Sequence, residues 1–189
     1  MNWKTIFNPF GKFDEKHILV LGIIFFIINI FICEYSGMVN DSIFHLSFIN
    51  ENQTIWDILK INSLSYAFAI IVLFILAKSF NNKTRIIDII NTILISAIPL
   101  AIVPLITGLP FLKDATQSIA KSAGDPSQVD MANLILVTVF GLATLPLMIY
   151  SFVLLYNGFQ TATNIKKWQQ IVLFVIVVFV QIIVSQTIL

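Results

Sequence analysis

Charge is scarce in this sequence of 189 residues, in which Asp, Glu, Lys and Arg together make up only 11% of the chain. A soluble domain carries about 25% charged residues, and it needs them to cover its surface. Hydrophobic residues make up 58% of the chain, and phenylalanine alone occupies 17 positions. This balance argues against a soluble enzyme, a nucleic-acid-binding domain and a disordered regulator, and it places the chain in a lipid bilayer.

The residues of catalysis and metal binding are also few. Cys33 is the single cysteine, so no intrachain disulfide can form, and we interpret it as a small packing residue. His17 and His45 are the only histidines, and no cluster of potential ligands has the spacing of a metal site. Motifs of intramembrane proteases and glycine-rich phosphate loops are missing. We therefore expect no enzyme, no catalytic residue, no metal and no cofactor.

Five long apolar runs dominate the chain. A helix needs about 20 apolar residues to cross a hydrocarbon core of about 30 Å. Each run must be helical, because an open strand in lipid would leave its backbone amides unpaired. The sequence therefore predicts an all-α fold, a bundle of five transmembrane helices in a domain over 18–189, preceded by an amphipathic segment over 1–17. The expected spans are 18–35, 61–78, 86–112, 131–156 and 168–189.

Basic and acidic residues divide between alternate connections. Eight of the 11 basic residues lie in the N-terminal segment and in the second and fourth connections. Seven of the 10 acidic residues lie in the first and third connections. Because basic residues are retained on the cytoplasmic side, we predict a cytoplasmic N-terminus and a C-terminus on the opposite side.

The N-terminal segment places Trp3, Phe7, Phe10 and Phe13 at helix-like spacing among lysines. Such a pattern is typical of a short helix in the headgroup region, with its lysines toward anionic lipid. Pro9 should interrupt that helix, because proline has no backbone N–H. The segment is either a lipid-sensing or partner-binding arm or a passive anchor for the first span, and we favour the anchor.

The first and third connections differ in polarity. Residues 43–49 are apolar but too short to span, and we expect an interfacial or re-entrant element packed on the bundle. Residues 113–130 contain Gly124 and Pro126 among polar residues, which predicts a polar loop. Within it, residues 125–127 could cap the start of the fourth helix.

Asp88 is the one acid or base within the apolar part of any run. It is the third residue of its run, so it should lie within a turn of the cytoplasmic edge and pair with Lys83, Arg85 or Lys78. We favour a structural role at the interface over ion coupling. Neutral polar residues in the spans could either join helices or line a polar cavity. Four of them discriminate between these alternatives: Asn62, Asn91, Ser96 and Thr144.

Prolines interrupt two of the spans. Pro99 and Pro104 deprive the carbonyl groups of Ile95 and Leu100 of their usual donors, which predicts a kinked third helix. Pro146 gives the fourth helix a similar hinge. The third helix is either broken around a site, as in transporters, or statically kinked, and we favour a static kink.

Two short motifs carry a family resemblance. Residues 154–164 have the sequence LLYNGFQTATN, and residues 6–10 have the sequence IFNPF. With five spans and a cytoplasmic N-terminus, the chain resembles a bacterial member of the Yip-one domain family of Ypt/Rab-interacting membrane proteins. The resemblance implies a five-helix domain in the bacterial inner membrane. Eukaryotic members are implicated in vesicle trafficking, Rab GTPase binding and membrane shaping, often as oligomers. Their Asp-Leu-Tyr-Gly-Pro stretch is not found here, so Rab binding is not carried over.

We therefore expect a non-enzymatic, membrane-organising scaffold with a trafficking-like role. Its expected partners are membrane lipids and a second copy or other membrane proteins, and no nucleic acid. The alternative is a transporter or channel for a small solute or ion, with a pathway beside the third and fourth helices. The candidate functional surface gathers seven residues near the cytoplasmic face: Arg85, Asp88, Tyr156, Asn157, Gly158, Lys166 and Lys167.

Overall fold

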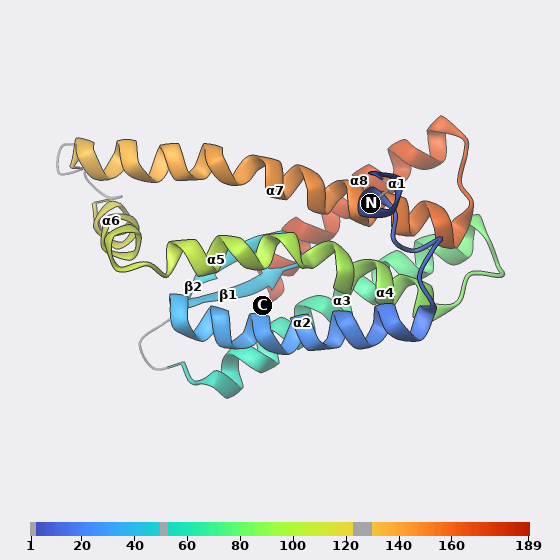
Figure 1. Ribbon diagram of the computed structural model, residues 1–189, viewed down its shortest axis with the longest axis horizontal. Coiled ribbons are helices and arrows are strands. Elements are labelled where there is room, and N and C mark those ends of the chain that lie inside the picture. Colours follow the sequence, from blue (N-terminus) through green and yellow to red (C-terminus); the bar gives the residue numbers. More distant parts are fainter. Residues whose placement is uncertain (1–2, 50–52, 123–129) are drawn as a thin grey trace.

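The computed structural model describes residues 3–49, 53–122 and 130–189, and these residues form a helical membrane protein (Figure 1). Five helical segments in this part of the chain are long and apolar enough to cross a membrane. The predicted all-α fold with five spans is confirmed. The spans are α2 (Glu15–Ser36), α3 (Ile55–Phe80), the segment Ile86–Thr107, α7 (Met131–Thr163) and α8 (Trp168–Ile188).

Local signals set the ends of these helices. Asp57 accepts the backbone N–H of Thr54 at 2.8 Å, which satisfies one of the free donors at the start of α3. Asp130 accepts the backbone N–H of Ala132 at 3.0 Å and so caps α7. The predicted cap at 125–127 lies outside the described residues. Gly37, with φ of 71°, ends α2 in the left-handed conformation that glycine adopts at little cost.

The third span is interrupted rather than continuous. It consists of α4 (Ile86–Ala97), a 3-10 turn (η1, Pro99–Ala101) and α5 (Ile102–Thr107). The turn falls at Pro99, which lacks the N–H that an α-helix requires. The α-helical hydrogen bonding is therefore broken where the sequence predicts a kink, and a bend of the axis stays a prediction.

The third span also ends earlier than the sequence predicts. It stops at Thr107, not at residue 112, because Leu109 precedes a proline and is held extended. Pro110 then begins a further helix, α6 (Pro110–Lys121), with proline at the position where its missing N–H costs nothing. The polar loop expected over 113–130 is therefore wrong up to Lys121. Polar composition hid an amphipathic helix that buries Leu112 and packs on α7.

The apolar run over 43–49 belongs to an antiparallel hairpin, with β1 (Met38–Ser42) and β2 (His45–Phe48). The expected element is packed on the bundle, but as strands that satisfy each other's backbone groups. β1 contacts α3 and α8. The backbone N–H of Asn40 donates to Asn62 Oδ1 at 2.9 Å, and Ser185 Oγ donates to the carbonyl of Asp41.

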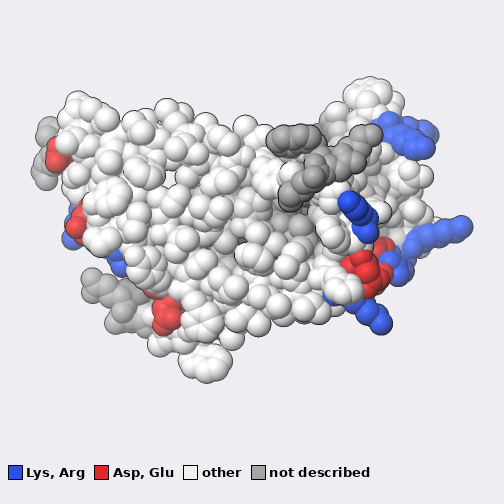
Figure 2. Space-filling model, viewed as in Figure 1, with Lys and Arg blue, Asp and Glu red and all other residues white. Residues whose placement is uncertain are grey.

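The N-terminal helix, α1 (Trp3–Phe7), ends before Pro9, as the sequence predicts. It lies at the end of the bundle where α4 and α8 begin and α7 ends (Figure 1). We call this the strap end, and we call the opposite end, with β1, β2 and α6, the hairpin end. On the face shown in Figure 2, charged side chains gather toward these two ends and the middle carries none.

The core is formed where α3, α4, α7 and α8 meet. Leu73, Ile89, Leu155 and Phe159 are fully buried there, and Phe174 stacks on Phe159 with ring centroids 4.5 Å apart. Large apolar side chains such as those of Ile75, Leu142 and Ile183 point outward instead. An apolar outside between two charged ends is the pattern expected of a protein that lies in a bilayer.

Candidate functional site

The N-terminal segment is fixed to the end of α7 by side chains of that helix. Tyr150 donates its hydroxyl to the carbonyl of Ile6 at 2.9 Å, and Asn157 donates its amide to the carbonyl of Phe7 at 2.7 Å. The rings of Phe7 and Tyr150 also meet edge to face at 5.7 Å. We call residues 6–13 the strap, because they cross the end of the bundle and are held there by α7.

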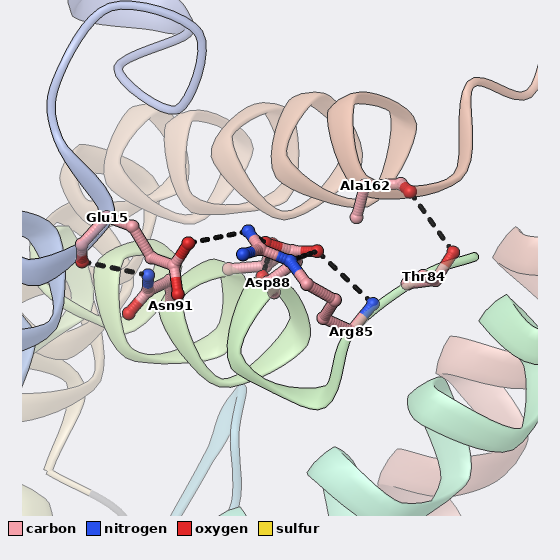
Figure 3. A network of polar contacts seen from close by, with 7 residues as sticks. Glu15, Thr84, Arg85, Asp88, Asn91 and Ala162 are labelled. Atoms are coloured by element: carbon pink, nitrogen blue, oxygen red, sulfur yellow. Dashed lines mark hydrogen bonds and ion pairs between the residues drawn. The ribbon is translucent and has the colours of Figure 1, made fainter.

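An arginine joins two carboxylates beside the strap (Figure 3). Arg85 Nη2 lies 2.7 Å from Asp88 Oδ1 and 2.5 Å from Glu15 Oε2. Asp88 also accepts the backbone N–H of Arg85 at 3.3 Å, so it caps α4 where the helix dipole favours a negative charge. Hydrogen bonds to Asp88 and Glu15 raise the pKa of Arg85 above its ordinary value. The guanidinium is therefore permanently charged and links α4 to the start of α2.

Asp88 lies at the start of α4, where the sequence predicts it. Of its three predicted partners, Arg85 makes the ion pair, whereas Lys78 donates to the carbonyl of Asn82 at 2.7 Å. A second link at this end runs from Thr84, whose hydroxyl donates to the carbonyl of Ala162 in α7 at 3.1 Å (Figure 3). The N-terminal segment, the connection before α4 and the end of α7, which the sequence places on one side of the membrane, are therefore in contact with one another.

A cavity of about 430 Å³ opens among these segments. The strap contributes Phe10 and Phe13 to its wall, and the beginnings of α2 and α4 contribute three carboxylates and one amide. The last turns of α7 complete the wall with residues from Gly158 to Ala162. Gly158 allows this close approach, since a Cβ there would lie 2.6 Å from Thr92 Oγ1 and 2.9 Å from the Phe10 ring. The polar residues that line the cavity are Asp14, Glu15, Arg85, Asp88, Asn91, Thr92 and Thr161.

Asn91 is a deeply buried polar residue of the cavity wall. Its residue is 4% exposed, and its Nδ2 donates to the carbonyl of Glu15 at 3.2 Å. That bond fixes the orientation of the amide, and Oδ1 is buried with no partner among the described protein atoms. A buried acceptor without a donor costs free energy, and this one belongs to a residue that lines the cavity.

The predicted surface is only partly brought together. Arg85, Asp88 and Gly158 line the cavity, and Asn157 holds the strap beside it. Tyr156 turns instead toward Phe174 of α8, with ring centroids 6.1 Å apart.

Lys166 and Lys167 are exposed in the connection between α7 and α8 and do not line the cavity. Of the predicted hinges, Pro99 and Pro104 are buried in the third span. Pro146 lies within α7, which continues through it, and is exposed on the outside of the bundle.

Sequence reasoning did not assign Glu15, Thr92, Phe10 and Phe13 to the site. A signal was present within α4, where Asp88, Asn91 and Thr92 follow the spacing that places residues on one helix face. Glu15 carried no such signal, because its contact with Arg85 joins positions 70 apart in the sequence.

Comparison with known proteins gives one result. A family model described as Yip1 domain matches residues 3–189. No curated protein and no solved structure matches the chain. Among the described residues, no group of three or more histidine, cysteine, aspartate or glutamate side chains could hold a metal ion.

Proposed function

This chain belongs to the Yip1 domain family, and we propose that it is a non-enzymatic membrane-organising scaffold that acts through contacts with lipids and other membrane proteins. The observation that carries the proposal is the use of polar groups inside the spans. Asn62 accepts a hydrogen bond from the hairpin, and Ser96 donates to the carbonyl of Ile93 in its own helix at 2.9 Å. Asn62 joins α3 to the hairpin and Ser96 is satisfied within its own helix, which supports a structural use of both groups.

The four residues that discriminate between the alternatives separate in space. Asn91 lines the cavity at the strap end. Thr144 donates to the carbonyl of Gly141 within α7 at 2.8 Å, and Asn62 pairs with Asn40 at the hairpin end. A solute pathway would require such groups to share one continuous polar volume. Their separation favours a scaffold.

A transporter or channel for a small solute or ion is the second candidate. The observation in its favour is the position of the polar cavity, which lies between α4 and α7, the third and fourth spans. Asp88 lines that cavity and would be the residue that couples an ion. Its ion pair with Arg85 supports the structural role instead.

We further propose that the strap end faces the cytoplasm, in the inner membrane of a bacterial cell. The strap end carries Lys12, Lys16, Lys78, Lys83, Arg85, Lys166 and Lys167. Basic residues are retained on the cytoplasmic side during insertion, which supports this orientation. The carboxyl end of α8 would then lie on the opposite side.

Reconstitution tests the scaffold against the transporter. Purified protein is incorporated into vesicles at increasing ratios to lipid, vesicle shape is imaged by electron cryomicroscopy, and efflux of ions and small solutes is recorded. We expect shape to change with protein content and efflux to match that of protein-free vesicles. Efflux that needs the protein and is abolished by Asp88→Asn would overturn the scaffold in favour of the transporter. Vesicles of unchanged shape at every ratio would also contradict it.

A further inference from the structure

An apolar groove borders the polar cavity at the strap end. It has a volume of about 470 Å³, and Phe13 and Ile18 line both the groove and the cavity. Its remaining wall comes from the strap, α2, the Pro99 region and α7, including Ile6, Leu21, Ile98 and Leu154. Both volumes lie in the range of about 300–1,000 Å³ that is typical of ligand sites in proteins.

The groove and the cavity together have the polarity of one lipid molecule. The cavity lies among the charged groups at the strap end, which is the level of lipid headgroups. The groove passes Ile18 and then Leu21, about one turn further along α2 and away from that end. A polar compartment that shares part of its wall with an apolar one, at Phe13 and Ile18, fits a headgroup with an attached acyl chain.

The polar compartment favours a cationic donor. Asp14, Glu15 and Asp88 supply three carboxylates, whereas Arg85 supplies the single basic side chain among its lining residues. The buried Oδ1 of Asn91 adds an acceptor without a partner. A primary ammonium group matches this lining, because it is positively charged and carries three N–H donors. A quaternary ammonium has the charge but no N–H donor, and an anionic headgroup would meet the excess of carboxylates.

We propose that the cavity and groove bind one phospholipid with a primary-amine headgroup of the ethanolamine type. The ammonium group occupies the cavity beside Asn91 Oδ1 and the carboxylates, and an acyl chain occupies the groove along α2. The strap covers the junction through Phe13. This inference rests on the proposed scaffold function and names the lipid class that such a scaffold would recognise.

Native mass spectrometry of the detergent-solubilised full chain tests the proposal. The protein is titrated with phosphatidylethanolamine, phosphatidylcholine and phosphatidylglycerol that carry identical acyl chains, and with phosphoethanolamine, which has none. We expect phosphatidylethanolamine to bind about tenfold more tightly than the other two lipids, the difference that one charge-assisted hydrogen bond provides. We expect phosphoethanolamine to bind far more weakly, because it leaves the groove empty.

Two variants address the two compartments separately. Asn91→Leu removes the buried acceptor at similar volume and should abolish the preference for the ethanolamine headgroup. Leu21→Trp fills the groove and should weaken all three lipids by about tenfold or more. Ile24→Trp is its matched control, since Ile24 is 48% exposed and Leu21 is 47% exposed on the same helix, but Ile24 does not line the groove. Thermal melting establishes that each variant is folded.

Three binding outcomes would count against the proposal. Equal binding of the ethanolamine and choline lipids would overturn recognition of the headgroup, and a preference for phosphatidylglycerol would reverse the assigned charge. Tight binding of phosphoethanolamine would indicate a soluble amine ligand. If the lipid preference is missing while vesicle shape still responds, this inference fails and the proposed function stands. If Asp88-dependent efflux appears while the lipid preference persists, the proposed function fails and this inference stands.

Discussion

Asn157 in α7 donates its side-chain amide to the carbonyl of Phe7 at 2.7 Å, across 150 positions of sequence. This bond makes the N-terminal segment part of the folded bundle. It also connects the two motifs that carry the family resemblance, since Asn157 and Phe7 each lie within one of them.

Loss of that bond should loosen the strap. Asn157→Leu leaves the Phe7 carbonyl without its donor, at a cost of about 1 kcal/mol. We therefore expect amide hydrogen exchange over residues 6–13 to become about fivefold faster, because local opening governs exchange there. Thr144→Val is the control, since that hydroxyl bonds only to its own helix at Gly141. Unchanged exchange in Asn157→Leu would show that the bond does not hold the strap.

The two glycines of α7 provide a matched pair for the packing of α7 on α4. A Cβ at Gly158 would lie within 3.0 Å of both Thr92 and Phe10, whereas a Cβ at Gly141 meets nothing within 4 Å. We expect Gly158→Ala to lower the free energy of unfolding by about 1–3 kcal/mol through overpacking. Gly141→Ala should raise it by about 0.5–1 kcal/mol, because glycine weakens a helix interior. Thermal melting in detergent measures both, and equal effects would contradict the close approach at Gly158.

At the hairpin end, Ser185 of α8 holds the first strand in place. Its hydroxyl donates to the carbonyl of Asp41, and both residues are buried. Ser185→Ala leaves a buried carbonyl without its donor, which should cost about 1–3 kcal/mol. Thr187→Val is the control, because Thr187 is exposed and bonds to Val184 of its own helix. Equal melting temperatures of Ser185→Ala and the parent protein would contradict this role.

The spans could be predicted from sequence because the bilayer imposes a length and a polarity on each helix separately. The pairing of Asp88 with Arg85 could also be predicted, because the two residues lie three positions apart at the start of one helix. The hairpin could not be predicted, because its first strand is held in part by α8, where Ser185 bonds to Asp41 across 144 positions. The same holds for the strap, whose partners Tyr150 and Asn157 lie more than 140 positions away.

Composition was misleading at two places. Residues 113–121 are polar enough to suggest a loop, yet they belong to α6, which buries Leu112 and Ala115. Lys166 and Lys167 follow the family-like motif directly, yet they lie outside the cavity that its Gly158 lines. In both cases the contacts of a side chain depend on how its helix or connection packs in the fold, and the neighbouring residues in the sequence do not reveal them.

The ion pairs of Arg85 predict a stability contribution that does not vary with ordinary pH. Hydrogen bonding to Asp88 and Glu15 raises the pKa of Arg85, so the stabilisation is complete below the pKa of the unfolded arginine and is lost only as pH rises through the higher folded value. Both values lie far above neutrality. The melting difference between the parent protein and Arg85→Gln should therefore be constant from about pH 6 to about pH 9 as far as arginine titration is concerned.

The same pairs are accessible to solvent, which makes them sensitive to salt. The Arg85 side chain is 61% exposed, so added ions should screen it. We expect the melting difference to become smaller in about 0.5 M sodium chloride. Lys83→Gln is the control for loss of one exposed positive charge next to the same helix. A difference that is unaffected by salt would show that Arg85 acts through packing and not through its charge.

Labelling of introduced cysteines with a membrane-impermeant thiol reagent tests the topology. Cys33 is fully buried, so the parent protein should remain unlabelled and serve as the background. Cysteines at Lys83 and Lys167, which are exposed at the strap end, should be labelled only after a cell is permeabilised. Cysteines at Lys121 and Asp130, exposed toward the hairpin end, should be labelled in intact cells once the outer envelope is open.

The pattern across the four positions distinguishes two kinds of error. Reversed labelling at all four would retain five crossings and invert the molecule, so that the ethanolamine site would face the other leaflet. Labelling of the Lys83 and Lys121 variants from the same side would contradict the crossings themselves, because one span, Ile86–Thr107, lies between these two positions. The helix of that span is interrupted at Pro99, which makes Lys121 the most informative of the four positions.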